Sequence, residues 1–163
     1  MLTAALRVAA TALVPDARPT NNATARRAAE ILVGKGLGFA IPTSIQKKIV
    51  VMAFVKRDMI VYGKAFDIIK TSGNVDLSDP EDVERHLKQI TLYEIKSTVK
   101  ECKANFAGHF FSLTAAEILV SQSLKDQFRF VFVKVPAGDY LEMTLSQMFA
   151  RAKGIYPGWS LSF

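Results

Sequence analysis

Three segments with the character of β-strands, residues 60–69, 92–99 and 128–135, constrain the fold of this chain more than any other feature. In the last of them, Phe130 and Phe132 alternate with Val131 and Val133. Residues 60–69 are apolar on both faces, which is typical of a strand covered on both sides of a sheet. Helical patterns separate these strands. The order predicts an α/β (α+β) domain with a central mixed sheet flanked by helices.

Four helices are predicted from periodicity and capping signals. Residues 76–90 begin with Asp79 and Pro80, a cap followed by proline at the first helical position. Thr114 precedes Glu117 with the spacing of a capping box. Residues 45–56 contain β-branched residues that favour a strand, but Ser44 is a plausible cap, and we favour a helix. The fourth helix spans residues 23–33.

Three further segments have weaker signals. The apolar segment 1–14 is interpreted as a helix or strand of the fold, and the aromatic residues 106–111 as the edge of a strand. The tail, residues 141–163, is predicted to combine a helix with a loop around Gly154, Pro157 and Gly158.

Length and composition indicate one soluble domain over residues 1–163. The 163 residues include a single cysteine, Cys102, which excludes an internal disulfide and a cysteine-based zinc site and fits a reducing cytoplasm. His86 and His109 are too few for a histidine-rich site, so a bound metal would be held by oxygen, as magnesium or manganese is. The net charge of +6 favours a polyanionic partner. The sequence contains no apolar run long enough to cross a membrane.

The candidate catalytic residues lie on two of the predicted strands. Glu94 and Lys96 are two residues apart and therefore project from the same face. If the strand that carries Asp67 lies beside them, two carboxylates converge on one divalent cation with an ammonium group next to them. The carboxylates would hold the ion, and the lysine would orient or deprotonate a water or offset developing charge. This pattern predicts metal-assisted hydrolysis of phosphodiester bonds.

The segments 65–68 and 93–98 resemble the PD…(D/E)xK signature of the restriction-endonuclease-like superfamily. The order of elements is nearest to the nuclease-like domain at the carboxy terminus of NO VEIN proteins. The matching features cover about residues 25–135 and are Ala29-Glu30, Phe66-Asp67-Ile68, Glu94-Ile95-Lys96, Leu113 to Glu117 and Phe128 to Val135. The resemblance implies an endonuclease that binds Mg²⁺, with Mn²⁺ as a substitute, and cuts DNA or RNA. Because one such centre cuts one strand, cleavage of both strands would require two copies, and we expect a homodimer.

Two departures from the family pattern are visible. Ala65-Phe66 stands where the family often has proline before the aspartate. Asp67 and Glu94 are 27 positions apart, so the helix around residues 80–88 must be inserted between the motif strands. Neither departure removes a metal ligand.

Several other charged residues are candidates for the site. Glu30 is a possible additional metal ligand or a surface acid, and Glu117 belongs to a capping arrangement or joins the site. The weaker candidates for contact with nucleic acid are Lys47, Lys48, Lys100 and Lys103. Two structural alternatives remain open: a buried ion pair between Asp67 and Lys96, and an exposed edge strand that carries Glu94. The rival function is a catalytically inactive nucleic-acid-binding or assembly module with the same fold.

Overall fold

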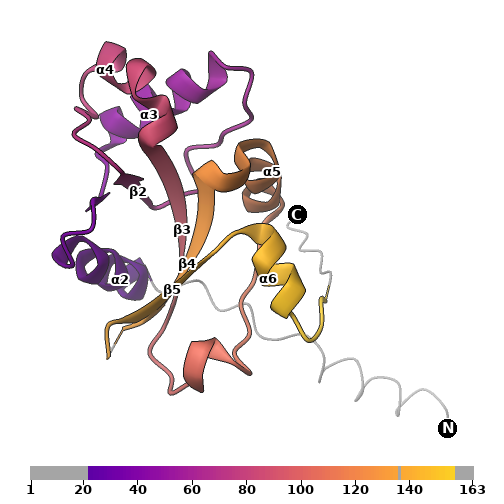
Figure 1. Cartoon of the computed structure of the whole chain (residues 1–163). Coiled ribbons are helices and arrows are strands. Elements are labelled where there is room, and N and C mark those ends of the chain that lie inside the picture. The colour runs from indigo at the N-terminus through magenta and orange to yellow at the C-terminus, as the bar shows by residue number, and fades with distance from the viewer. Residues whose placement is uncertain (1–21, 136, 157–163) are drawn as a thin grey trace, which may run out of the picture.

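The computed structural model describes residues 22–135 and 137–156, so the predicted element at 1–14 and the end of the tail lie outside the described residues. The fold is α/β with an open, mixed, five-stranded sheet (Figure 1). The spatial order of the strands follows the sequence, and only β3 and β4 are parallel neighbours. The strands are β1 (Phe39–Ala40), β2 (Ile68–Thr71), β3 (Ile90–Thr98), β4 (Phe128–Lys134) and β5 (Asp139–Met143).

Helices cover both faces of this sheet (Figure 1). The α-helices are α2 (Asn22–Gly34), α3 (Ser44–Val55), α4 (Pro80–Arg85), α5 (Ala115–Leu124) and α6 (Leu145–Arg151). Short 3₁₀ helices are η1 (Leu87–Gln89), η2 (Ala104–Phe106) and η3 (Lys125–Gln127). Within the described ranges, no helix has the length and apolar character needed to span a bilayer.

Two hydrophobic clusters hold the layers together, one on each face of the sheet. On the first face, Phe54 of α3 and Val120 of α5 pack with Leu92 and Phe130. On the second, α2 packs against Ile68, Tyr93, Ile95, Val131 and Val133. Alternate residues of β3 and β4 enter opposite clusters, because successive side chains of a strand point to opposite faces. This alternation fixes which helices each polar side chain of β3 faces.

All four helix predictions are confirmed, with one change in a cap. The N-cap of α3 is Thr43, which forms a capping box with Gln46, and Ser44 is the first helical residue. Thr114 and Glu117 form the predicted capping box of α5. The predicted helix over 76–90 is divided into α4 and η1, and its cap is Asp79.

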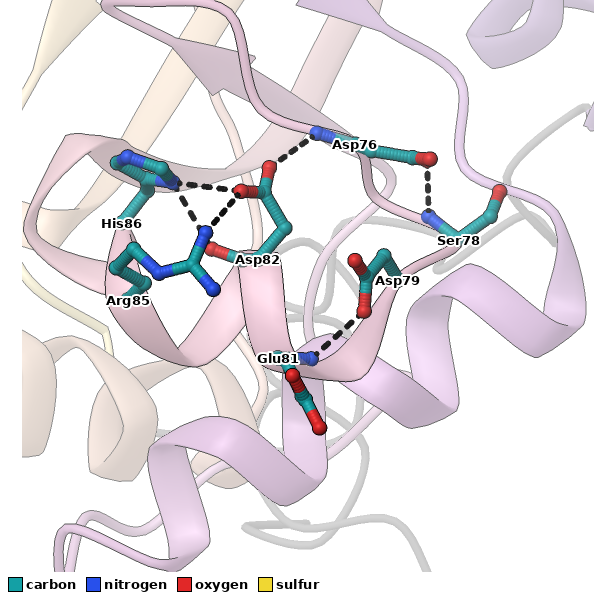
Figure 2. A network of polar contacts seen from close by, with 7 residues as sticks. All are labelled: Asp76, Ser78, Asp79, Glu81, Asp82, Arg85 and His86. Carbon is teal, nitrogen blue, oxygen red and sulfur yellow. Dashed lines mark hydrogen bonds and ion pairs between the residues drawn. The ribbon is translucent and has the colours of Figure 1, made fainter.

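Side-chain hydrogen bonds organise the connection from β2 to β3 (Figure 2). Asp79 Oδ1 accepts from the amide of Glu81 at 2.9 Å. Asp82 accepts from the amide of Asp76 at 2.8 Å and pairs with Arg85 and His86. The Asp76 amide is the main cause of a lowered pKa for Asp82. The inserted segment is therefore an ordered connection between the two motif strands.

Two strand predictions and the prediction for the tail need correction. Residues 60–67 are irregular and β2 begins at Ile68, since the chain turns where Tyr62 O accepts from the amide of Ala65 at 2.9 Å. Residues 106–111 form no strand: η2 ends at Phe106, and Phe111 packs its ring on Phe132 of β4 at 4.6 Å. The predicted tail contains α6, but residues 139–143 are the edge strand β5.

Candidate functional site

Asp67 is held against β3 next to Glu94. The antiparallel register pairs Ile68 with Tyr93, and Asp67 is the residue just before β2 begins. Its own contacts are to the residues on either side of Glu94. The Asp67 amide donates to Tyr93 O at 2.8 Å, and Asp67 Oδ2 accepts from the amide of Ile95 at 2.9 Å. The carboxylate thus takes the place of a backbone acceptor and is held against β3.

Lys96 is paired with two carboxylates. Its Nζ lies 3.0 Å from Glu94 Oε1 and 2.8 Å from Glu117 Oε2, so it bridges β3 and α5. The side chains of Lys96, Glu94 and Glu117 are 12%, 13% and 7% exposed. The alternative of an exposed edge strand is wrong, because β3 is the central strand. The ion-pair partners of Lys96 are these two acids, and the alternative pair with Asp67 is not formed among the described residues.

Glu117 has two roles. Its Oε2 accepts from the Thr114 amide at 3.2 Å in the capping box and also pairs with Lys96. The capping interpretation of this residue is confirmed, and the same carboxylate also contacts Lys96, since one carboxylate can accept several hydrogen bonds.

Lys47 reaches the same cluster from α3. Its Nζ donates to Phe66 O at 2.6 Å and to Gly63 O at 3.3 Å, and it lies 4.7 Å from the centre of the Phe66 ring. Burial lowers the pKa of Lys47, while the nearby charges of Asp67 and Glu94 oppose that change. Lys47 thus stabilises the turn that precedes Asp67 through these two hydrogen bonds. It is the second cation near the site, after Lys96.

Glu94 has a strongly perturbed acidity. Burial is the largest cause that raises its pKa, to about 8; Lys96 opposes this rise, and the carboxylates of Asp67 and Glu117 add to it. The Glu94 carboxyl therefore keeps its proton to a higher pH than an exposed glutamate does. Carboxylates that repel one another across a buried space are a setting in which a divalent cation is favoured.

The other candidate residues lie away from this cluster. Glu30 is on α2, across the sheet, where it pairs with Arg26 and Arg27 at 3.4 Å, so the structure does not bring it to Asp67 and Glu94. Lys48 is exposed and lines a groove between α3 and α4 with Met52 and Lys56. The exposed Lys100 and Lys103 lie in the loop after β3.

The donor set fits an ion that binds few protein ligands. Within residues 22–135 and 137–156, no three His, Cys, Asp or Glu side chains are grouped so as to hold a metal by themselves. Asp67 is hydrogen-bonded to the amide of Ile95, the residue after Glu94, and both side chains supply carboxylate oxygens. Mg²⁺ commonly keeps several waters and takes one or two carboxylates, which suits this pair better than it suits zinc or calcium.

The helical periodicity of the sequence contained a signal for Lys47 and Glu117, which were only weak candidates for the site. Lys47 is three and seven positions from Val50 and Phe54, which are fully buried. Glu117 is three and seven positions from Val120 and Leu124, on the buried face of α5. Both residues are charged side chains at core-facing positions of a helix, and this unusual placement could have identified them from the sequence.

Comparison of the chain with protein-family models, with curated proteins and with solved structures finds no match. The function proposed below therefore rests on the geometry of the chain itself.

Proposed function

We propose that this protein is a metal-dependent endonuclease that hydrolyses phosphodiester bonds in DNA, with Asp67, Glu94 and Lys96 as its catalytic centre. One observation carries the proposal: a partly buried aspartate is hydrogen-bonded to β3 between the two members of a partly buried Glu-x-Lys pair. A mixed sheet flanked by helices supports the restriction-endonuclease-like superfamily as the fold family. Within that superfamily, we propose that the order of elements and motifs in this chain is most similar to the nuclease-like domain of NO VEIN proteins.

Each residue of the cluster has a distinct task in this reaction. Asp67 and Glu94 would hold Mg²⁺ or Mn²⁺, which when bound polarises a phosphate and lowers the pKa of water. Asp67 is fixed for that task by the Ile95 amide. Lys96, held between Glu94 and Glu117, is placed to orient the attacking water or to offset charge that develops on the phosphate. Lys47 holds the turn that carries Asp67.

One observation favours the rival function, a binding module without catalysis. Lys96 already has two acidic partners, Glu94 and Glu117, and a largely buried network of this kind can be purely structural. In that case Asp67 serves only to cap the amide of Ile95. Cleavage separates the two functions, because only the endonuclease needs a divalent ion and an ionised Asp67.

The test uses purified protein, supercoiled plasmid and Mg²⁺. Asp67→Asn keeps an acceptor for the Ile95 amide but removes the charge, and we expect it to reduce nicking by about a hundredfold or more. Lys96→Ala should have a similar effect. Glu30→Gln is the matched control, because that acid lies across the sheet, and it should nick like the unaltered protein.

Two results would count against the endonuclease. Equal nicking by all the variants would identify a contaminating enzyme. Plasmid and single-stranded DNA and RNA that all stay intact, with nucleic-acid binding retained in the absence of magnesium, would instead establish the binding module. Cleavage of an RNA of the same sequence with DNA left intact would reassign the substrate and leave the three residues in their roles.

Cleavage of both DNA strands requires two such centres, and a homodimer is the economical arrangement. Light scattering of the protein–DNA complex should give the mass of two chains plus that of the DNA. A monomer under conditions of double-strand cleavage would contradict this arrangement.

A further inference from the structure

An exposed surface beside the candidate site combines two aromatic rings with four cations. Phe110 is 54% and Tyr156 71% exposed, and their ring centroids are 6.4 Å apart with an interplanar angle of 37°. The four cations are exposed and come from the same two segments of the chain, the loop after β3 and the end of α6. We call Lys100, Lys103, Phe110, Arg151, Lys153 and Tyr156 the aromatic–cationic patch.

Two contacts hold the segments of this patch together. Arg151 Nη2 donates to Asn105 O at 3.3 Å, which ties the end of α6 to the loop after β3. The ring contact between Phe110 and Tyr156 joins the same two segments at a second point. The two segments that carry the cations and the rings therefore lie side by side.

The loop is anchored next to the candidate catalytic centre. Phe106 and Phe111 pack on Phe132 of β4, with ring centroids 5.9 Å and 4.6 Å away. The parallel register places Phe132 directly beside Lys96. In Figure 1 the loop leaves β3 at the end of the sheet opposite α3 and α4. A chain bound to the patch would thus run toward Lys96.

The charge of this surface is strongly positive. The one acid in the loop between β3 and η2 is Glu101, which is paired with Lys134 at 2.8 Å. Among residues 22–135 and 137–156, none of the four cations of the patch forms an ion pair. Cations attract phosphates, and exposed rings stack on bases that are not paired. Duplex DNA hides the faces of its bases within the stack and offers the rings no partner.

We infer that the aromatic–cationic patch binds a single-stranded segment of nucleic acid and delivers it to the centre at Lys96. The inference rests on the proposed function because it names the substrate form of that site: an unpaired strand, flap or loop. The stacking rings set this preference, and the cations supply affinity without reading sequence.

The test measures anisotropy of a labelled oligonucleotide in EDTA, so that binding is observed without cleavage. We expect the single strand to bind at least about tenfold more tightly than its duplex, as stacking of a base on a ring implies. The double variant Phe110→Leu/Tyr156→Leu keeps apolar side chains but removes both rings, and it should lose this preference. Tyr156→Phe keeps a ring and should retain it.

Ile155→Ser is the matched control. Ile155 is 62% exposed beside Tyr156, and the substitution removes apolar surface without removing a ring. Unchanged affinity for the single strand is expected. Equal binding of strand and duplex that is insensitive to ring removal would overturn the inference. Self-association that is lost in the double leucine variant, without a strand preference, would assign the surface to a second copy and also overturn it.

Failure of the proposed function is distinguishable from failure of the inference. Ring-dependent binding of the single strand by a protein that cuts nothing with Mg²⁺ supports the patch and refutes the endonuclease. Cleavage lost in Asp67→Asn, together with no preference for the single strand, supports the endonuclease and refutes the patch.

Discussion

At the scale of single residues, the acidity of Glu94 gives the candidate site a dependence on pH. The folded protein holds this proton up to a pKa of about 8, whereas an unfolded glutamate loses it near its ordinary value of 4.5. Between these values the folded state binds more protons than the unfolded state. The contribution of Glu94 to the free energy of unfolding therefore falls as pH rises from about 4.5 to 8.

Glu94→Gln removes that titration. We expect the variant to gain stability relative to the unaltered protein as pH rises from about 5 to about 9, because the amide never carries the buried charge. Urea denaturation at several pH values measures the difference between the two proteins. A difference that does not change with pH would show that Glu94 ionises as an ordinary surface acid.

Lys47 and Lys48 form a natural pair for comparison, since they are adjacent in sequence but face different surroundings. Lys47→Ala frees two backbone carbonyls and should lower the free energy of unfolding by about 1–3 kcal/mol. Lys48→Ala changes an exposed side chain and should stay within about 0.5 kcal/mol. Chemical denaturation compares them. Equal losses would contradict the anchoring role of Lys47.

At the scale of elements, α4 depends on its cap. Asp79 accepts from the Glu81 amide, and Val83 of the same helix is fully buried (Figure 2). Asp79→Ala should therefore lower the free energy of unfolding by about 1 kcal/mol. Glu81→Ala removes an acid from the same turn but leaves the cap, and a few tenths of a kcal/mol is expected. Thermal melting that ranks Glu81 above Asp79 would contradict this assignment.

Capping signals and strong periodicity were sufficient to predict the helices and the two long strands of this fold. The predicted strand over 60–69 was mostly wrong. Apolar side chains such as Val61 and Phe66 are buried although their backbone forms a turn and not a strand. Lys47 donates to carbonyl groups of that turn, which would otherwise need partners in a sheet. Strand β5 was missed because five residues at the edge of a sheet carry little periodic signal. Local pattern does not encode such long-range partners.

The candidate site was predictable only in part for the same reason. The two-residue spacing of Glu94 and Lys96 is local and needed no structure. Glu117 contacts Lys96 only because β3 and β4 are parallel. Parallel strands need a long crossover connection, and here that connection contains α5, which carries Glu117 back to β3. The position of Glu30 depends on which face of the sheet α2 covers. The sequence of α2 alone is compatible with packing on either face.

At the scale of the whole molecule, the excess of basic residues should appear as salt dependence. The net charge is +6, and the aromatic–cationic patch contributes four cations to it. If those cations contact phosphates, the logarithm of single-strand affinity should fall against the logarithm of salt with a slope of about −3. Lys100→Ala should make that slope shallower by about 0.7. A slope near zero in anisotropy titrations would exclude phosphate contact.

The hydrogen bond from the Ile95 amide to the Asp67 carboxylate also gives the molecule a built-in reporter. This amide lies in the central strand, yet its acceptor is a side chain of the candidate site. The nuclear magnetic resonance signal of this amide and its rate of exchange with solvent deuterium therefore depend on whether the Asp67 carboxylate accepts the hydrogen bond or binds another group. A single backbone resonance can follow the occupancy of the centre without substrate, turnover or an added label.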